Sequence, residues 1–589
     1  MKFQAYTCLA GAVIAAAGIP AAAVNAASVF LTGGQINTED FTVTDTVTVS
    51  EGNNFLNSSD VMVVESLVVS GGVLAGAPSA GGIVDTGGNS ITVSGGQLGG
   101  GLAIANDETV TVTGGRFFPQ SNETIANLIQ SGGEVGESTR DFTVTNAFTQ
   151  TGGTTSGRNI GTGTFTQSGD GTIAAGTVLT AGSVQLQGGI IAGTLGGPGA
   201  VTVSGGTTRL TGSIVGTTAL TVAGGRLEAT GTGTIDTASD IVTVSGGTLV
   251  IDEGAFAPFN ETLVIEGGTV TGGNLAVSSI TQSGGLIAEG TTITTRSGST
   301  LSGGVIAGTL TGDSLRSTVA FLSSGTTTLT GTMGGNISVG ADATFDIKAG
   351  GFSNSEGQFY ANLGTLNNAG TIATSGGLIN EGVLRNSGTI DVGGLVRNRN
   401  SGTLQVDGTL TAGGVRSTGS MISGGGTIDA DVDLLGATIA PGNSPGTLTI
   451  DGNLSADASS VLAFELGGLM QGDDYDWLNV SGNVSLGQGA LFEIDYFGGF
   501  EAEAGDTFDI LTGNSFLFDD LTDFAFDFTD VSNTGIDWSA SIFDVEGGRE
   551  AVRLTAVSTV TPVPLPAGGL LLLGGLAGLA ALRRRKRAA

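Results

Sequence analysis

Histidine is absent from the 589-residue sequence, and cysteine occurs once, at Cys8. The missing histidine removes the side chain that most often serves as a general base or metal ligand near neutral pH. Because Cys8 lies in an apolar run close to the N-terminus, we expect it to leave with a signal peptide. The mature chain would then have no thiolate nucleophile, disulfide or cysteine zinc site. Lysine is scarce as well, since only Lys348 stands outside the two terminal segments.

Charged residues make up 12% of the chain, and most are acidic, with 53 Asp and Glu against 20 Lys and Arg. Without Lys2 and the five basic residues 583–587, the body keeps 14 basic residues against all 53 acidic ones, a formal charge of −39. Such a body repels nucleic acid and anionic lipid. We therefore expect no nucleic-acid partner.

The N-terminus has the three parts of a secretory signal peptide. A basic start at Lys2 precedes an apolar run over residues 8–19 and small residues up to Ala26. This order predicts a signal peptide over residues 1–26, with cleavage between Ala26 and Ala27 and with Val24 and Ala26 in the small pockets of the peptidase. The alternative is a retained membrane anchor, for which the apolar run is short. The implied partners are the secretion translocon and signal peptidase.

A strand-like stretch followed by a glycine, usually doubled, recurs along the chain, as in Val201-Thr-Val-Ser-Gly-Gly and Val242-Thr-Val-Ser-Gly-Gly. The spacing averages about 19.5 residues, and the first glycines are residues 71, 95, 114, 132, 152, 169, 188, 205, 224, 246, 267, 284, 303 and 325. This interval is too short for a propeller blade and fits one coil of a β-solenoid. We expect an all-β fold, an elongated parallel β-helix over residues 27–430, with the glycine pairs supplying positive φ at the corners.

A second repeat begins near Leu366 and contains Asn-Ala-Gly or Asn-Ser-Gly before an apolar strand, at Asn368, Asn386 and Asn400. These tripeptides are turn formers that tolerate left-handed backbone. The Gly-rich body with this repeat resembles the passenger β-helices of autotransporter adhesins. The resemblance implies an architecture and no activity.

Residues 431–560 have a different sequence pattern from the repeats before them. We predict that they form an acidic, β-rich cap, because a bare terminal coil would expose strand edges. Both tryptophans, Trp477 and Trp538, lie here. The segment from Ala440 to Leu511 resembles the part that closes many autotransporter passengers. Autotransporters continue into a membrane barrel, whereas no alternating strand series follows residue 556, so self-transport is disfavoured.

Residues 561–589 form the tail. A helix from Ala567 to Leu582 would reach ~24 Å, and snorkelling arginines could extend it towards a ~30 Å hydrocarbon core. We expect a short C-terminal transmembrane helix marked by Gly568, Leu570, Leu573, Leu576, Leu579 and Leu582. By the positive-inside rule, the basic cluster stays cytoplasmic; it comprises Arg583, Arg584, Arg585, Lys586 and Arg587. The simpler alternative is a plain membrane tether without processing.

The tail also carries a sorting motif, formed by Val563, Pro564, Leu565, Pro566 and Ala567. The motif is followed by an apolar helix and then by terminal arginines. This order resembles the VPLPA variant of the PEP-CTERM sorting signal of Gram-negative bacteria. The resemblance covers residues 563–587 and implies recognition by an exosortase-type transpeptidase that cuts near the motif.

Three acidic groups are candidate sites. Asp519, Asp520, Asp523, Asp527 and Asp530 alternate with phenylalanines and could hold Ca²⁺, or could form a solubilising surface. Asp429, Asp431 and Asp433 stand at alternate positions and should share one strand face, where a cation would relieve repulsion. Asp474 and Asp476 could act as paired carboxylates in glycoside hydrolysis, although a structural role explains them as well.

These observations favour an exported structural or adhesive β-helix protein of the cell envelope or extracellular matrix, without catalytic, cofactor-binding or metal residues. Its Thr, Ser and Asn side chains would hydrogen-bond extracellular polysaccharide. The alternative is a carbohydrate-active enzyme, a polysaccharide lyase or hydrolase, which would need carboxylates and Lys or Arg gathered in one groove. The expected location is first the inner membrane, as an anchored precursor, and then the cell surface or the medium.

Overall fold

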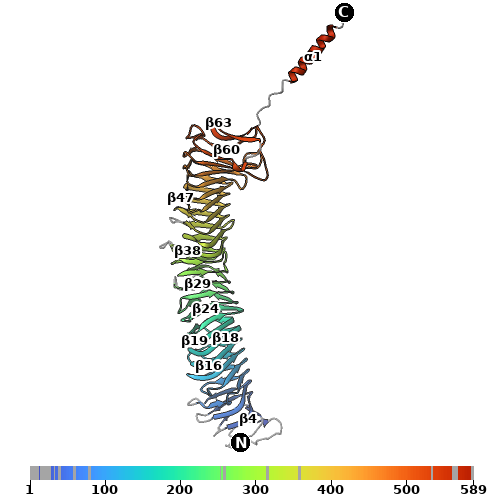
Figure 1. The fold of residues 1–589 in the computed structure, drawn as a ribbon. Helices are drawn as coiled ribbons and strands as arrows, with labels where there is room; N and C mark the ends of the chain where they lie inside the picture. The colour runs from blue at the N-terminus through green and yellow to red at the C-terminus, as the bar shows by residue number, and fades with distance from the viewer. Residues whose placement is uncertain are drawn as a thin grey trace, which may run out of the picture. The chain divides into compact units, whose positions relative to one another are not determined.

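The computed structural model describes residues 12–13, 28–31, 34–36, 41–56, 61–76, 81–252, 254–256, 260–313, 318–355, 360–531, 535–559 and 568–585. They form an all-β parallel β-solenoid of about 21 turns with almost no helix, which confirms the predicted parallel β-helix (Figure 1). The chain divides into two compact units, residues 1–397 and residues 398–589.

A turn of the first unit contains up to three strands, and in some turns neighbouring strands merge into one longer strand, as in β18 (Asn159–Ile173). One turn consists of β21 (Ala200–Val203), β22 (Thr207–Leu210) and β23 (Ser213–Val215). The next consists of β24 (Ala219–Val222), β25 (Arg226–Ala229) and β26 (Thr234–Asp236), and the corresponding strands pair in parallel. Val201 pairs with Leu220, 19 residues on. The sequence period is therefore one turn of the solenoid.

Successive turns place the strands of the first unit in three columns. The first column contains β2 (Ser28–Leu31), β4 (Phe41–Val49), β6 (Val61–Val69), β9 (Ser90–Val93), β12 (Thr109–Val112), β14 (Glu123–Gln130), β16 (Asp141–Gln150), β18 (Asn159–Ile173), β19 (Val178–Ile191), β21, β24, β27 (Ile241–Val244), β29 (Thr262–Ile265), β32 (Ser279–Gln282), β35 (Ser299–Leu301), β38 (Thr318–Leu329), β40 (Asn336–Ile347), β42 (Tyr360–Asn362) and β45 (Leu378–Asn380). The second contains β3 (Gly34–Ile36), β5 (Asn53–Leu56), β7 (Val73–Gly76), β10 (Gln97–Gly99), β13 (Arg116–Phe118), β15 (Glu134–Val135), β17 (Thr154–Thr155), β22, β25, β28 (Thr248–Ile251), β30 (Thr269–Gly272), β33 (Leu286–Ile287), β36 (Gly304–Ile306), β43 (Thr365–Asn368) and β46 (Val383–Asn386), together with the later parts of β18, β19, β38 and β40. The third contains β8 (Ile83–Asp85), β11 (Ala103–Ile104), β20 (Thr194–Gly196), β23, β26, β31 (Asn274–Val277), β34 (Thr292–Thr295), β37 (Thr309–Gly312), β39 (Thr332–Gly334), β41 (Phe352–Ser355), β44 (Thr371–Thr374) and β47 (Thr389–Arg399), together with the first parts of β4, β6, β14, β16, β18 and β19.

The core consists of apolar side chains stacked from turn to turn. One inward column contains Val201, Leu220, Val242, Leu263 and Ile280, each at most 1% exposed. Burying one such side chain contributes ~1.5–3 kcal/mol. Because its partners belong to the neighbouring turns, no turn is stable alone.

The glycine pairs occupy corners, but the predicted reason is only partly correct. Gly206 and Gly285 have positive φ, of 54° and 67°. Gly246, Gly247, Gly267 and Gly268 do not. A Cβ at Gly247 would collide with the carbonyl oxygen of Gly225, and one at Gly268 with that of Gly247. At these corners, close approach between turns excludes a side chain.

The asparagines of the second repeat also differ from the prediction. Asn400 has a φ of 54°, as expected of a turn former. Asn368 and Asn386 instead point inward and are at most 1% exposed. The Nδ2 of Asn368 donates to the Oδ1 of Asn386, one turn on, at 2.8 Å. These two residues form a buried amide pair, and the Nδ2 of Asn368 also donates to the backbone carbonyl of Thr389 at 3.0 Å.

The second unit continues the parallel pairing well beyond residue 430 and then changes direction. Its parallel strands are β48 (Thr403–Val406), β49 (Thr409–Thr418), β50 (Met421–Gly424), β51 (Thr427–Asp429), β52 (Val432–Leu435), β53 (Thr438–Pro441), β54 (Thr447–Ile450), β55 (Leu454–Ala456), β56 (Val461–Leu466), β57 (Trp477–Val480), β58 (Asn483–Leu486), β59 (Leu491–Tyr496), β60 (Thr507–Gly513), β61 (Ser515–Phe516) and β62 (Ala525–Asp527). The hairpin of β63 (Ile536–Val545) and β64 (Arg549–Ser558) then pairs antiparallel with β60. This hairpin occupies a strand edge that would otherwise be open.

The helix α1 (Gly568–Arg585) confirms the predicted tail helix, but the expected membrane span is not supported. Among the helical residues that the structure describes, no segment is both long and apolar enough to cross a membrane. The 18 residues of α1 include five glycines and end on Arg583, Arg584 and Arg585. Its uncharged part would measure ~22 Å, against ~30 Å for the hydrocarbon core.

Several predicted terminal residues lie outside the described part of the chain: Val24, Ala26, Ala27, Val563, Pro564, Leu565, Pro566, Ala567, Lys586 and Arg587. Within the predicted signal peptide, β1 (Ala12–Val13) is described, and it pairs in parallel with β2.

Replacing Gly247 by alanine is expected to destabilise the solenoid by about 1–3 kcal/mol, because the methyl group would overlap backbone of the preceding turn. Gly205→Ala is the matched control, since the nearest atom to an added Cβ there is 4.0 Å away. Urea unfolding followed by circular dichroism compares the two variants. Equal midpoints would contradict the close-approach explanation.

Candidate functional site

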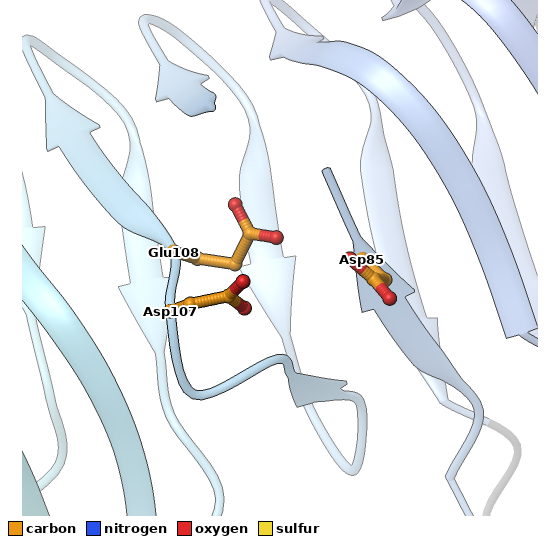
Figure 2. A group of neighbouring side chains, drawn as sticks. All are labelled: Asp85, Asp107 and Glu108. Atoms are coloured by element: carbon orange, nitrogen blue, oxygen red, sulfur yellow. The ribbon is translucent and has the colours of Figure 1, made fainter. Parts of the chain in front are cut away.

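The first candidate site is a group of three acidic residues at a corner of the first unit. Asp85 ends β8, while Asp107 and Glu108 belong to the loop before β12, as Figure 2 shows. One carboxylate oxygen from each of the three lies within 4.8 Å of the others. Glu108 is fully buried, whereas Asp107 is exposed.

The buried carboxylate of Glu108 has two hydrogen-bond donors from one residue of the preceding turn. It accepts hydrogen bonds from both the backbone N–H and the hydroxyl of Thr86, in the preceding turn. Charge-assisted bonds of this kind stabilise an ionised group inside a fold. Glu108 therefore holds the corner of one turn against the next.

The same arrangement recurs further along the unit. Asp236, Asp240 and Glu261 form the second acidic group. The N–H and hydroxyl of Thr237 donate to Glu261 at 2.8 and 2.9 Å. Burial raises the pKa of Glu261 above its ordinary value. Sequence reasoning missed both groups, although a signal existed, because a Glu-Thr pair precedes an apolar residue at residues 108, 123 and 261.

Glu123 is the third member of this series. Its carboxylate accepts hydrogen bonds from the backbone N–H groups of Ile104 and Gln120. Burial raises the pKa of Glu123 from 4.5 to about 7, although both hydrogen bonds act in the opposite direction. The solenoid thus contains a carboxyl group that changes its charge near neutral pH.

The other predicted acidic candidates serve mainly to hold the backbone. Asp429 ends β51 and Asp433 lies in β52, with a corner between them, so the expectation that Asp429, Asp431 and Asp433 share one strand is wrong. Asp431 accepts from the backbone N–H of Asn453 at 2.8 Å, and Asp433 pairs with Arg416 at 3.1 Å.

Asp474 and Asp476 have different environments. Asp476 is 2% exposed and accepts from the N–H groups of Gly446 and Glu465, both at 2.8 Å. Burial raises its pKa to about 7. Asp474 accepts from the N–H of Met470 at 3.2 Å. Asp474 braces its own loop, whereas Asp476 connects it to Gly446 and Glu465, and both have the structural role that the sequence also allowed.

Three carboxylates between Asp519 and Asp530 accept hydrogen bonds from other protein groups. Asp520 and Asp527 each accept from the N–H and hydroxyl of a threonine two residues on. Asp523 accepts from Gln488 at 2.9 Å. Over the described residues, the acidic groups that converge at metal-ligand distance are those of Glu108 and Glu261, and neither includes this segment.

Arginine and carboxylate meet on the outer face of β22 and β25. Glu228 accepts from Arg226 at 2.7 Å and from Arg209 at 3.2 Å. The hydrogen bond from Arg226 lowers the pKa of Glu228. Since both carboxylate oxygens are engaged by guanidinium groups, this cluster is suited to pairing and not to proton abstraction.

A repeated hydroxyl surface runs along the first strand column. Strand register aligns one outward position per turn from Thr48 to Thr300, and none of these side chains is buried. The "threonine column" denotes its ten threonines: Thr48, Thr92, Thr111, Thr149, Thr166, Thr202, Thr221, Thr243, Thr281 and Thr300. The other four aligned positions hold Val68, Ile129, Gln185 and Val264. Hydroxyls ~4.8 Å apart therefore occur in short runs, of which Thr202, Thr221 and Thr243 is the longest.

The Glu123 carboxyl should make stability pH-dependent. Between pH 4.5 and about 7 the folded carboxyl keeps a proton that the unfolded chain has lost, so stability falls as pH rises through this window. The loss should be at most about 3 kcal/mol. Glu123→Gln should flatten the profile of unfolding midpoint against pH, whereas Glu65→Gln, at an exposed position, should not. An unchanged slope in Glu123→Gln would refute this assignment.

No family model matches the chain, and a search of curated proteins returns no match.

Proposed function

We propose that the protein is an exported structural or adhesive β-solenoid that binds extracellular polysaccharide through the threonine column. The observation that carries the proposal is the recurrence of threonine at ten of the fourteen aligned outward positions. Each hydroxyl offers one donor and two acceptors, which suits the hydroxyls of a sugar chain. A polymer has a repeat of its own and can contact several turns at once.

Repetition compensates for weak single contacts. One hydrogen bond contributes ~0.5–1.5 kcal/mol net. Once one sugar is bound, however, its neighbours on the same chain meet the next hydroxyls at high effective concentration. The body charge of −39 also keeps such molecules apart until a polymer bridges them. These properties fit adhesion to a matrix.

Delivery by the C-terminal tail is the second part of the proposal. The motif and arginines of residues 563–587 resemble a PEP-CTERM sorting signal, which would direct the protein through an exosortase-type transpeptidase to the cell surface or the medium. The described part of the tail supports a role in recognition, since the α1 leucines are 57–74% exposed: Leu571, Leu572, Leu573, Leu576, Leu579 and Leu582.

Replacing Thr202, Thr221 and Thr243 together by valine should weaken binding to the producing cell's polysaccharide at least about tenfold, because three hydrogen bonds of ~0.5–1.5 kcal/mol each are lost and about 1.4 kcal/mol is a factor of ten. Valine keeps the β-branched shape and removes only the hydroxyl. The control replaces Thr207, Thr248 and Thr269, which lie outward in the second column. Co-sedimentation with the polysaccharide measures how much of each triple variant the polysaccharide retains. Equal retention by both triple variants would remove the threonine column from the proposal.

Deleting residues 561–589 should change where the protein accumulates, because the deletion removes motif, helix and arginines together. Cell fractionation with an antibody to the body measures the distribution. Intact mass of the mature full-length protein gives an independent test. A C-terminus still at Ala589, or an unchanged distribution of the truncated chain, would argue against processing.

A further inference from the structure

An open groove of about 530 Å³ lies at the C-terminal hairpin of the second unit. Sites for small ligands commonly measure ~300–1,000 Å³. The groove is formed by β62, the β63 strand and the segment 519–522 between β61 and β62. Three aromatic rings line it, together with two carboxylates and the hydroxyls of Thr522 and Ser541.

The aromatic rings of the groove are parallel. Phe526 and Phe528 have ring centroids 5.7 Å apart with planes at 9°, and Phe528 and Trp538 are 5.7 Å apart with planes at 7°. All three side chains are half-buried. The indole N–H of Trp538 donates to the backbone of Val531 at 3.4 Å, which fixes the ring. Phe526 also stacks on Phe492, with centroids 4.6 Å apart and planes at 10°. The exposed parts of the stacked rings form a preformed apolar surface, against which the C–H face of a sugar ring can pack.

The carboxylates beside these rings have no basic partner in their own segment, and Arg553, which lies opposite Ser541 on β64, is paired with Asp509. Asp519 and Asp520 are exposed at the groove, and neither forms a salt bridge in the described part of the chain. Residues 517–544 contain seven acidic residues and no basic one. The hydrogen bond from the Thr522 hydroxyl keeps the pKa of Asp520 below its usual range, so that carboxyl stays ionised. The groove therefore repels anionic polymers and attracts cations.

We infer that this groove binds a cationic amino-sugar chain, such as a glucosamine oligomer. The sugar rings would contact Phe526, Phe528 and Trp538, while a protonated amine would pair with Asp519 or Asp520. Aromatic faces add to this preference, because their quadrupole also attracts ammonium groups. A neutral glycan would use the rings alone, and an acidic one would meet the carboxylates.

This site is separate from the threonine column. It lies in the other unit and depends on ring stacking and charge, whereas the column offers uncharged hydroxyls. A failure of one binding surface therefore leaves the other unaffected.

Titration of the full-length protein with tetrameric glucosamine in mildly acidic buffer tests the inference, by calorimetry and by tryptophan fluorescence. We expect the tetramer to bind and to quench fluorescence. The N-acetylated tetramer should bind at least about tenfold more weakly, and a tetramer of galacturonate should not bind. Failure of the glucosamine tetramer to bind, or equal affinity for the acetylated one, would overturn the inference.

Variants separate the two components of the site. The double variant Asp519→Asn and Asp520→Asn should raise Kd for the glucosamine tetramer at least about tenfold, while the fold stays intact. Asp544→Asn is the matched control, because Asp544 is an exposed carboxylate of β63 outside the groove. Trp538→Ala should also raise Kd and abolish the quenching. An unchanged Kd in the double variant would refute the charge pairing, and equally tight binding of tetralysine would assign the groove to basic peptides instead.

Discussion

The register of each turn on the preceding one is the constraint on which the rest of the structure depends. Corner residues repeat the same backbone hydrogen bond, from Ser204 to Leu186, from Ala223 to Val203 and from Ser245 to Val222, at 2.8–3.0 Å. This repetition stacks equivalent positions directly. It produces the inward apolar columns, the outward threonine column and the need for glycine where two corners meet. A shift by a single residue would turn every one of these side chains to the opposite face.

Stacking also buries backbone N–H groups inside the solenoid. Polar side chains from adjacent turns accept hydrogen bonds from them. Glu108, Glu123 and Glu261 accept from backbone N–H groups at corners that would otherwise lack partners. Gln150 lies between Gln130 and Gln167 and bonds to both, at 3.1 and 3.0 Å. These residues explain why an acidic chain buries some of its carboxylates. Burial raises the pKa of Glu123 and of Glu261, which ties the stability of the solenoid to pH.

The C-terminal end of the second unit differs from the rest of the solenoid in its strand pairing and in its side chains. A parallel stack cannot close its last strand by itself, and the antiparallel hairpin of β63 and β64 supplies the missing partner for β60. Its aromatic side chains gather beside a segment without basic residues. The resulting groove combines apolar rings with ionised carboxylates, a combination absent from the threonine column.

The sequence by itself determined the repeat, the strand alternation and hence the parallel solenoid, because a period near 19 residues and a two-residue alternation are local properties of the chain. It also predicted the helix of the tail. Only the tertiary structure decided why Gly247 must be glycine, that Asn368 faces inward and that Asp429 and Asp433 lie on separate strands. Only the tertiary structure brought Asp519 and Trp538 to one groove. These features depend on contacts between residues from about 18 to 24 positions apart, and such contacts exist only once the turns have stacked.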